Sequence, residues 1–125
     1  MLFRSLEEKM KKHPSFKVSF SITGTWLIQA EKWAPDLIEK IQNMVKRGQA
    51  EIIDETFYHS LAFFFNREEF EEQVRLHTEK IEQLFKVKPQ IFRNTELSYN
   101  DELAKWAEEK GYKGILAEGD RKSVV

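Results

Sequence analysis

The sequence has 125 residues, 41% of them hydrophobic and 13% aromatic, and this composition excludes a disordered chain. Twenty basic and 21 acidic side chains leave a net charge of −1, which excludes the basic surface that nucleic acids or anionic membranes would need. No run approaches the ~20 apolar residues of a membrane span, no signal-peptide pattern opens the chain and cysteine is absent, so we expect one cytoplasmic domain over residues 1–125.

The first half of the chain predicts a helix, a strand and a second helix. Residues 2–12 form an amphipathic helical pattern that ends before Pro14, because the residue before a proline avoids helical angles. The β-rich run 16–22 (FKVSFSI) predicts a strand. From Pro35 the apolar residues recur at helical spacing, and Gly48 follows as a C-terminal cap.

The second half continues the same alternation. The expected strands cover residues 50–53, 90–93 and 112–116. The expected helices cover residues 67–86 and 100–111, whereas 61–65 fits a helix or a strand. His77 belongs to the apolar stripe of the longest helix, which indicates a structural role.

This alternation predicts an α/β fold made of parallel βα units. Four such units cannot close a barrel, so the sheet is either open or part of a larger one, and its two edges invite pairing with a second copy. In such sheets the reactive side chains follow the carboxyl ends of the strands. We expect those places to hold Glu51 with residues 54–59, then Glu96, then Glu118.

Glu96, in the run IFRNTELSY, is the first candidate for chemistry. A carboxylate between a strand and a helix can act as a nucleophile, a general base or a metal ligand. Arg93 nearby would keep this carboxylate ionised. The alternative is that Glu96 only caps the helix that follows.

The other candidates surround the second expected strand and the end of the first. We expect Asp54, Glu55 and His59 to form one cluster, which would bind a sugar through hydrogen bonds or bind a metal. Trp26, just past the first strand, either packs in the core or stacks on a sugar ring. The sequence contains no phosphate-binding or dinucleotide-binding glycine motif and no H-E-x-x-H, so we expect no cofactor and no resident metal.

Three segments, taken in order, resemble glycoside hydrolase family 57, the α-amylase and 4-α-glucanotransferase group. They are KVSFSITGTWL, GQAEIIDETFYHSL and IFRNTELSYND, and the resemblance covers about residues 16–119. It implies that the chain is part of an incomplete (β/α)7 barrel. Abundant Glu and Lys, with few Gly and no Cys, is also typical of thermophilic proteins.

The resemblance implies a retaining mechanism on α-1,4-glucans or maltooligosaccharides, with Glu96 as the nucleophile. Glu51 and His59 would hold hydroxyls of the sugar at the cleavage point. Beyond the resemblance, we infer from their positions that Arg93 and Tyr99 shape the surroundings of the nucleophile, that Arg93 contributes to substrate binding, and that Trp26 does so as well.

The sequence departs from the family pattern in two places. The His-Gln-Pro motif of the first strand is absent, and the acid/base Asp would lie beyond Val125. Because retaining hydrolysis needs two carboxylates, we expect the chain to be nearly inactive alone. The alternatives are a non-catalytic half-barrel that binds glucan or self-associates as a homodimer or larger oligomer, and a polysaccharide deacetylase using Asp54 and His59 as metal ligands.

Overall fold

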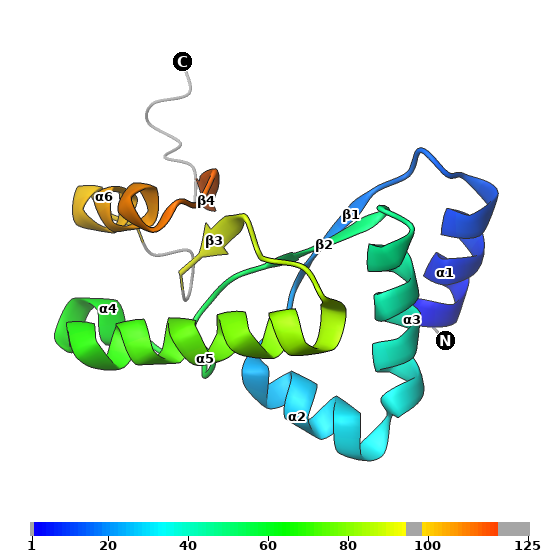
Figure 1. Ribbon diagram of the computed structural model, residues 1–125, viewed down its shortest axis with the longest axis horizontal. Coiled ribbons are helices and arrows are strands. Elements are labelled where there is room, and N and C mark those ends of the chain that lie inside the picture. Colours follow the sequence, from blue (N-terminus) through cyan, green and yellow to red (C-terminus); the bar gives the residue numbers. More distant parts are fainter. Residues whose placement is uncertain (1, 95–98, 118–125) are drawn as a thin grey trace.

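The computed structural model describes residues 2–94 and 99–117, which form helices packed on short parallel strands (Figure 1). The helices are α1 (Leu2–Lys12), α2 (Gly24–Trp33), α3 (Pro35–Lys46), α4 (Ala62–Phe65), α5 (Arg67–Phe85) and α6 (Asp101–Lys110). The strands are β1 (Val18–Ser21), β2 (Ala50–Ile53), β3 (Ile91–Arg93) and β4 (Gly114–Leu116). The predicted alternation of strands and helices is therefore confirmed. The ambiguous run 61–65 contains the one-turn helix α4.

All the described strands run parallel, as the alternation predicted. β1 pairs with β2 from Val18 opposite Ala50 onwards, and β3 pairs with β4 from Ile91 opposite Gly114 onwards. Asp54 joins the two pairs, because its N–H donates to the Ile91 carbonyl at 2.8 Å and its carbonyl accepts from the Arg93 N–H at 2.9 Å. The four strands thus lie in the order β1-β2-β3-β4.

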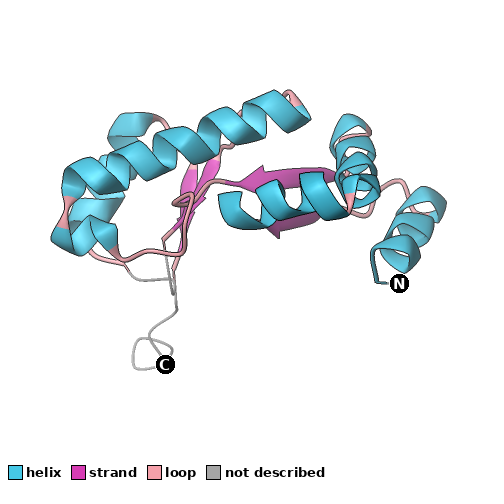
Figure 2. Cartoon of the chain, turned by 90° about the horizontal axis from the view of Figure 1, so that it is seen from below, coloured by secondary structure: helices cyan, strands magenta, loops and turns pink. Residues whose placement is uncertain are grey.

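The helices α5 and α6 lie on the same side of the strands (Figure 2). One buried cluster joins α2, α3 and α5 to the first two strands, with Ile41, Ile52 and Ile81 at its centre. A second cluster joins α5 and α6 to β3, where the rings of Phe70, Phe92 and Trp106 meet edge to face. Both clusters remove apolar surface from water, the main favourable contribution to folding.

Polar caps fix where the helices begin, and the residue at which the last helix was expected to start is the cap of α6. The Asn100 side chain accepts from the Leu103 N–H at 2.8 Å, and Thr23 and Asn66 cap α2 and α5 in the same way. Gly111 ends α6 with a φ of 88°, the left-handed conformation that glycine adopts without strain.

Two contacts attach outer segments to the strands. The buried Gln49 side chain donates to the carbonyls of Met10, His13 and Phe16, so the turn between α1 and β1 is fastened to the start of β2. The ring of Phe57, in the loop after β2, packs directly against Gly24. A Cβ on that glycine would stand 2.3 Å from the ring. The backbone of α2 therefore begins directly against the loop that follows β2.

Candidate functional site

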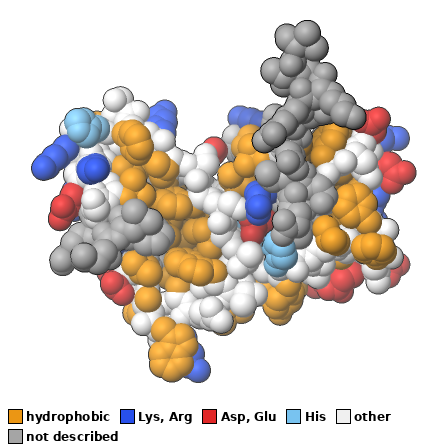
Figure 3. All heavy atoms as spheres, turned by 180° about the vertical axis from the view of Figure 1, so that it is seen from behind, with side chains coloured by type: hydrophobic (Ala, Val, Ile, Leu, Met, Phe, Trp, Pro, Cys, Tyr) orange, Lys and Arg blue, Asp and Glu red, His pale blue; other side chains and the backbone are white. Residues whose placement is uncertain are grey.

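The face of the sheet away from the helices carries polar side chains. Successive residues of a strand point to opposite faces, so Phe20 and Phe92 pack toward the helices while their neighbours point to the other side. The polar residues on this open face are Ser19, Ser21, Glu51, Glu55 and Arg93. Figure 3 shows the molecule from behind the view of Figure 1, with hydrophobic side chains gathered on this side and charged groups of both signs beside them.

Ser21, Glu55 and Arg93 meet at the carboxyl ends of three neighbouring strands. The Ser21 hydroxyl donates to Glu55 Oε2 at 2.5 Å, and Arg93 Nη1 lies 4.0 Å from the same oxygen. Arg93 Nη1 also lies 3.5 Å from Ser21 Oγ. The Glu55 side chain is only 7% exposed, so a hydroxyl and a guanidinium, rather than water, surround its carboxyl oxygen Oε2.

Glu51 belongs to the same face but sits earlier on the strand than predicted. It is the second residue of β2, so the expectation that it follows the strand end was wrong. Its exposed carboxylate accepts from the Ser19 hydroxyl at 2.6 Å, directly across the β1–β2 pairing. Two serine–glutamate hydrogen bonds therefore lie on the open face.

Trp26 belongs to α2, which begins shortly after β1. It is partly buried against the first apolar cluster, in agreement with the packing interpretation. It also lines a hollow of about 320 Å³ together with Phe20, Ser21 and Thr23. An aromatic side next to polar hydroxyls suits the face of a sugar ring.

The expected cluster of Asp54, Glu55 and His59 does not form. Asp54 and Glu55 are neighbours in an extended segment, so their side chains point to opposite faces of the sheet. Asp54 is fully buried on the helix side, whereas His59 is exposed in the loop after β2. Among residues 2–94 and 99–117, no group of three or more His, Cys, Asp and Glu side chains is arranged to hold a metal ion.

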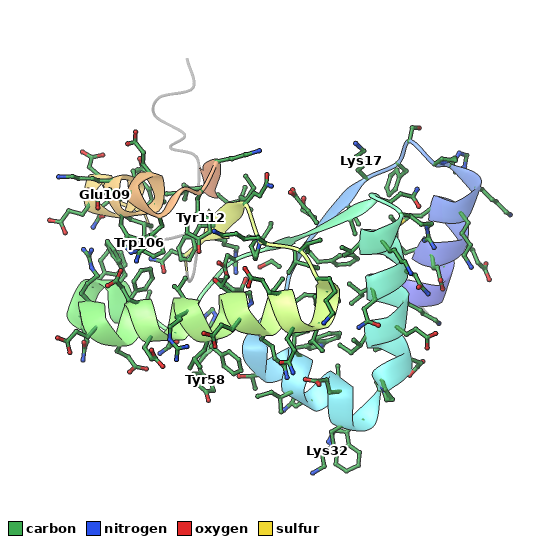
Figure 4. All side chains as sticks on the ribbon, viewed as in Figure 1. Lys17, Lys32, Tyr58, Trp106, Glu109 and Tyr112 are labelled. Atoms are coloured by element: carbon green, nitrogen blue, oxygen red, sulfur yellow. The ribbon has the colours of Figure 1, made fainter. Side chains whose placement is uncertain are left out.

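Asp54 is instead the centre of a buried network that the sequence pattern did not indicate. Its carboxylate accepts from Thr78 and Tyr112 hydroxyls, each at 2.5 Å, and lies 2.6 Å from Nδ1 of His77. Burial and the charge of Asp54 raise the pKa of the Tyr112 phenol far above its ordinary value. In Figure 4, Tyr112 lies beside Trp106 on the α6 side of the sheet. The structural role predicted for His77 is confirmed.

Of the remaining candidate residues, the structure describes Arg93 and Tyr99. Glu96 and Glu118 lie outside the described residues. Arg93 is the last residue of β3, three positions before Glu96 in the sequence. Tyr99 is half exposed just before α6. No helix in the described part of the chain is long and apolar enough to cross a membrane.

Comparison with known proteins identifies the chain's relatives. The sequence model of glycosyl hydrolase family 57 matches residues 1–125. The chain therefore belongs to glycosyl hydrolase family 57. Its parallel βα units are a part of the (β/α)7 barrel expected for this family.

Two relatives within family 57 carry the names of enzymes that act on α-glucans. A protein from Methanocaldococcus jannaschii assigned as an alpha-amylase is 41% identical over 86% of this chain and 23% of its own length. The structure of 4-alpha-glucanotransferase from Thermococcus litoralis matches with a TM-score of 0.79 at 25% identity, covering 90% of this chain and 18% of that one. The chain thus spans less than a quarter of either protein. Relatives in thermophilic archaea agree with the thermophilic composition.

One further likeness concerns the fold alone. A CE4 family pseudoenzyme from Bacillus anthracis matches with a TM-score of 0.70 at 20% identity, covering 91% of this chain and 37% of that one. The arrangement of parallel strands and helices seen in this chain therefore recurs in that protein.

Proposed function

We propose that this chain supplies the nucleophile-bearing part of a retaining enzyme that cleaves or transfers α-1,4-glucans. Glu96 attacks the anomeric carbon, and the acid/base carboxylate comes from sequence other than residues 1–125. The membership of family 57 and the alpha-amylase and glucanotransferase names of its relatives support this assignment.

The observation that carries the proposal is the meeting of Ser21, Glu55 and Arg93 on the open face. Arg93 ends the strand from which the chain continues to Glu96, so a guanidinium is anchored close in sequence to the nucleophile. Fixed charges of this kind act strongly in a site from which water is excluded. A glucan bound over this face would meet hydroxyl and carboxylate groups suited to its own hydroxyls.

Glu51, His59 and Trp26 complete the proposed substrate site. Glu51 offers a carboxylate on the open face, four residues before Glu55. Trp26 offers an aromatic side in the hollow next to Ser21, and His59 offers an exposed imidazole on the loop after β2. Each group makes a contact that sugars commonly accept: a hydrogen bond from a hydroxyl or stacking on a ring.

The test is maltooligosaccharide cleavage by the chain joined to the rest of a family 57 barrel, with and without Glu96→Gln. Retaining cleavage needs two carboxylates roughly 5–5.5 Å apart, so the variant loses turnover while its circular dichroism stays unchanged. Glu82→Gln, on the exposed side of α5, is the matched control and keeps full activity. Normal turnover by the Glu96 variant would remove Glu96 from the nucleophile role.

The same assay on the 125-residue chain alone separates the catalytic and non-catalytic interpretations. We expect a folded but nearly inactive protein. Activity that disappears with Glu96→Gln would mean that a complete site forms between copies of the chain.

We also propose that the isolated chain self-associates. Within the described strands, β1 pairs only with β2 and β4 pairs only with β3, so the outer edges of β1 and β4 present unused backbone groups. Large apolar side chains are also exposed, including Trp33 at 77% and Phe65 at 84%. Both features favour contact with another copy of the chain.

A further inference from the structure

The buried carboxylate of Asp54 gathers hydrogen-bond donors from several elements. Thr78 of α5 and Tyr112, which precedes β4, donate to Oδ2 at 2.5 Å. The Glu55 N–H donates to Oδ1 at 3.2 Å, and Nδ1 of His77 lies 2.6 Å from the same oxygen. Asp54 and His77 both have no exposed surface.

The contacts of His77 fix the number of protons that this pair carries. On its other side, Nε2 of His77 lies 2.7 Å from the Ile22 carbonyl oxygen, which can only accept a hydrogen bond. Nε2 must therefore carry a proton, and the short contact between Nδ1 and the Asp54 carboxylate needs a second one. The pair consequently holds one proton more than a neutral imidazole beside an ionised carboxylate.

This pair connects residues that follow different strands. Ile22 comes directly after β1, and Asp54 comes directly after β2. The backbone of Asp54 in turn bonds to Ile91 and Arg93 of β3. The pair thus lies beneath the strand ends, on the opposite side of the sheet from Ser21, Glu55 and Arg93.

We propose that His77 and Asp54 are positioning residues: a protonated His77, bonded at both ring nitrogens, holds the carboxyl ends of β1, β2 and β3 in the arrangement that brings Ser21, Glu55 and Arg93 together. The positioning acts through the backbone, because the Glu55 N–H bonds to the Asp54 carboxylate and the Arg93 N–H bonds to the Asp54 carbonyl. This proposal concerns the geometry of the strand ends and does not depend on glucan chemistry.

Several charged groups act on His77 and set the direction of its titration. Burial alone lowers the pKa of His77, but the hydrogen bond and charge of Asp54, the Ile22 carbonyl and the charge of Glu55 outweigh it, so the pKa is raised. Tyr112 faces the pair through Asp54 and stays neutral.

Two further charges belong to the elements packed around the pair. Arg93 lies 4.0 Å from Glu55 on the open face. Glu31 of α2 is held by Lys80 of α5 at 2.5 Å, with both side chains partly exposed. His77 is the group of this network whose ordinary pKa lies closest to neutral pH, so its titration sets the pH dependence.

The sign of the pH dependence follows from the raised pKa. The stabilisation is fully present below the unfolded-state pKa of about 6.5. It is lost as the pH rises from there through the folded-state pKa. Over that range the unfolding equilibrium constant grows by up to about tenfold per pH unit, the limit for one proton released on unfolding.

The first experiment is NMR spectroscopy of the ring nitrogens of His77 in the wild-type chain at pH 7.5. Two slowly exchanging ring N–H signals are expected, one for each hydrogen bond. A ring with a single protonated nitrogen at this pH would overturn the proposal, and this measurement needs no variant that must fold.

The second experiment compares amide hydrogen exchange in the wild type, His77→Gln and the control His13→Gln, whose imidazole is exposed. In His77→Gln the Glu55 and Arg93 amides exchange at least tenfold faster relative to the amide of Ile41 in α3, and the pH dependence of unfolding above pH 6.5 flattens. His13→Gln changes neither. Uniform acceleration of all three amides would show a merely structural role and overturn positioning.

Tyr112→Phe removes one donor to Asp54 without touching the pair and covers the case in which His77→Gln fails to fold. The same preferential exchange at Glu55 and Arg93, of smaller size, is expected. Unchanged exchange at both amides in this variant contradicts the proposal.

Discussion

The carboxylate of Glu55 and the guanidinium of Arg93 lie 4.0 Å apart on the open face of the sheet, although Glu55 follows β2 and Arg93 ends β3. The contact exists because Asp54 links β2 to β3 through two backbone hydrogen bonds. A link of this kind between strand pairs turns two short ladders into one platform for side chains.

Ser21 and Glu55 should be energetically coupled. A double-mutant cycle with Ser21→Ala and Glu55→Gln measures this in urea unfolding, and we expect a coupling free energy of about 1 kcal/mol because the Glu55 carboxylate is nearly buried. The exposed pair Arg75 and Glu79 on α5 is the control and should show a smaller coupling. Equal coupling free energies for the two pairs would mean that water weakens the Ser21–Glu55 hydrogen bond as strongly as it weakens the exposed ion pair on α5.

Gly24→Ala should destabilise the chain by about 1–3 kcal/mol, the usual cost of overpacking. The new methyl group would overlap the Phe57 ring, which closes the loop after β2 against the start of α2. Gly114→Ala is the control, since its methyl group would stand 3.3 Å from the tip of Ile91, a side chain that can move. Thermal unfolding of both variants checks the difference, and similar losses would contradict it.

Asn94→Leu should raise the free energy of unfolding by about 1 kcal/mol. The Asn94 side chain is fully buried, and neither its amide nitrogen nor its oxygen has a hydrogen-bond partner among residues 2–94 and 99–117. An apolar side chain of similar size removes that desolvation cost.

Asn100 provides the opposite case for the same measurement. Its side chain caps α6, so Asn100→Ala should lower stability by about 1 kcal/mol. Denaturant titration of Asn94→Leu and Asn100→Ala measures both changes in the free energy of unfolding. A loss of stability in Asn94→Leu would show that the Asn94 amide makes a bond in solution that outweighs its burial.

The isolated chain should scatter light as a dimer or larger species rather than as a 14.9 kDa monomer. The expected cause is the unpaired outer edges of β1 and β4. Dilution should shift the apparent mass downward if the contact is reversible. A concentration-independent mass near 14.9 kDa would rule out self-association.

The periodicity of the sequence was enough to predict most of the elements and their parallel direction, whereas the family was indicated by the resemblance of three segments. The strand expected over 16–22 is shorter in the structure, since only Val18–Ser21 pairs with β2. The helix expected from Pro35 and the helix expected from residue 100 were found where their local signals placed them. Such features depend on nearest neighbours along the chain, which is why a sequence reveals them.

The arrangement around Asp54 could not be predicted in the same way. Asp54, Glu55 and His59 are close in sequence, and counting charged residues grouped them. The structure separates Asp54 and Glu55 because they alternate across the sheet, and it pairs Asp54 with His77, Thr78 and Tyr112 from distant segments. A contact between distant segments leaves no periodic mark in the sequence.

The side chain of Gln49 attaches the N-terminal helix α1 to the strands, so this helix is not a loose extension. Its one amide group serves three carbonyls at the end of α1 and in the turn before β1. A cut in that turn would let the three carbonyls move away. The buried amide of Gln49, the residue directly before β2, would then lose its acceptors. α1 is therefore expected to resist proteolysis and to unfold together with the β1–β2 pair, as one cooperative unit.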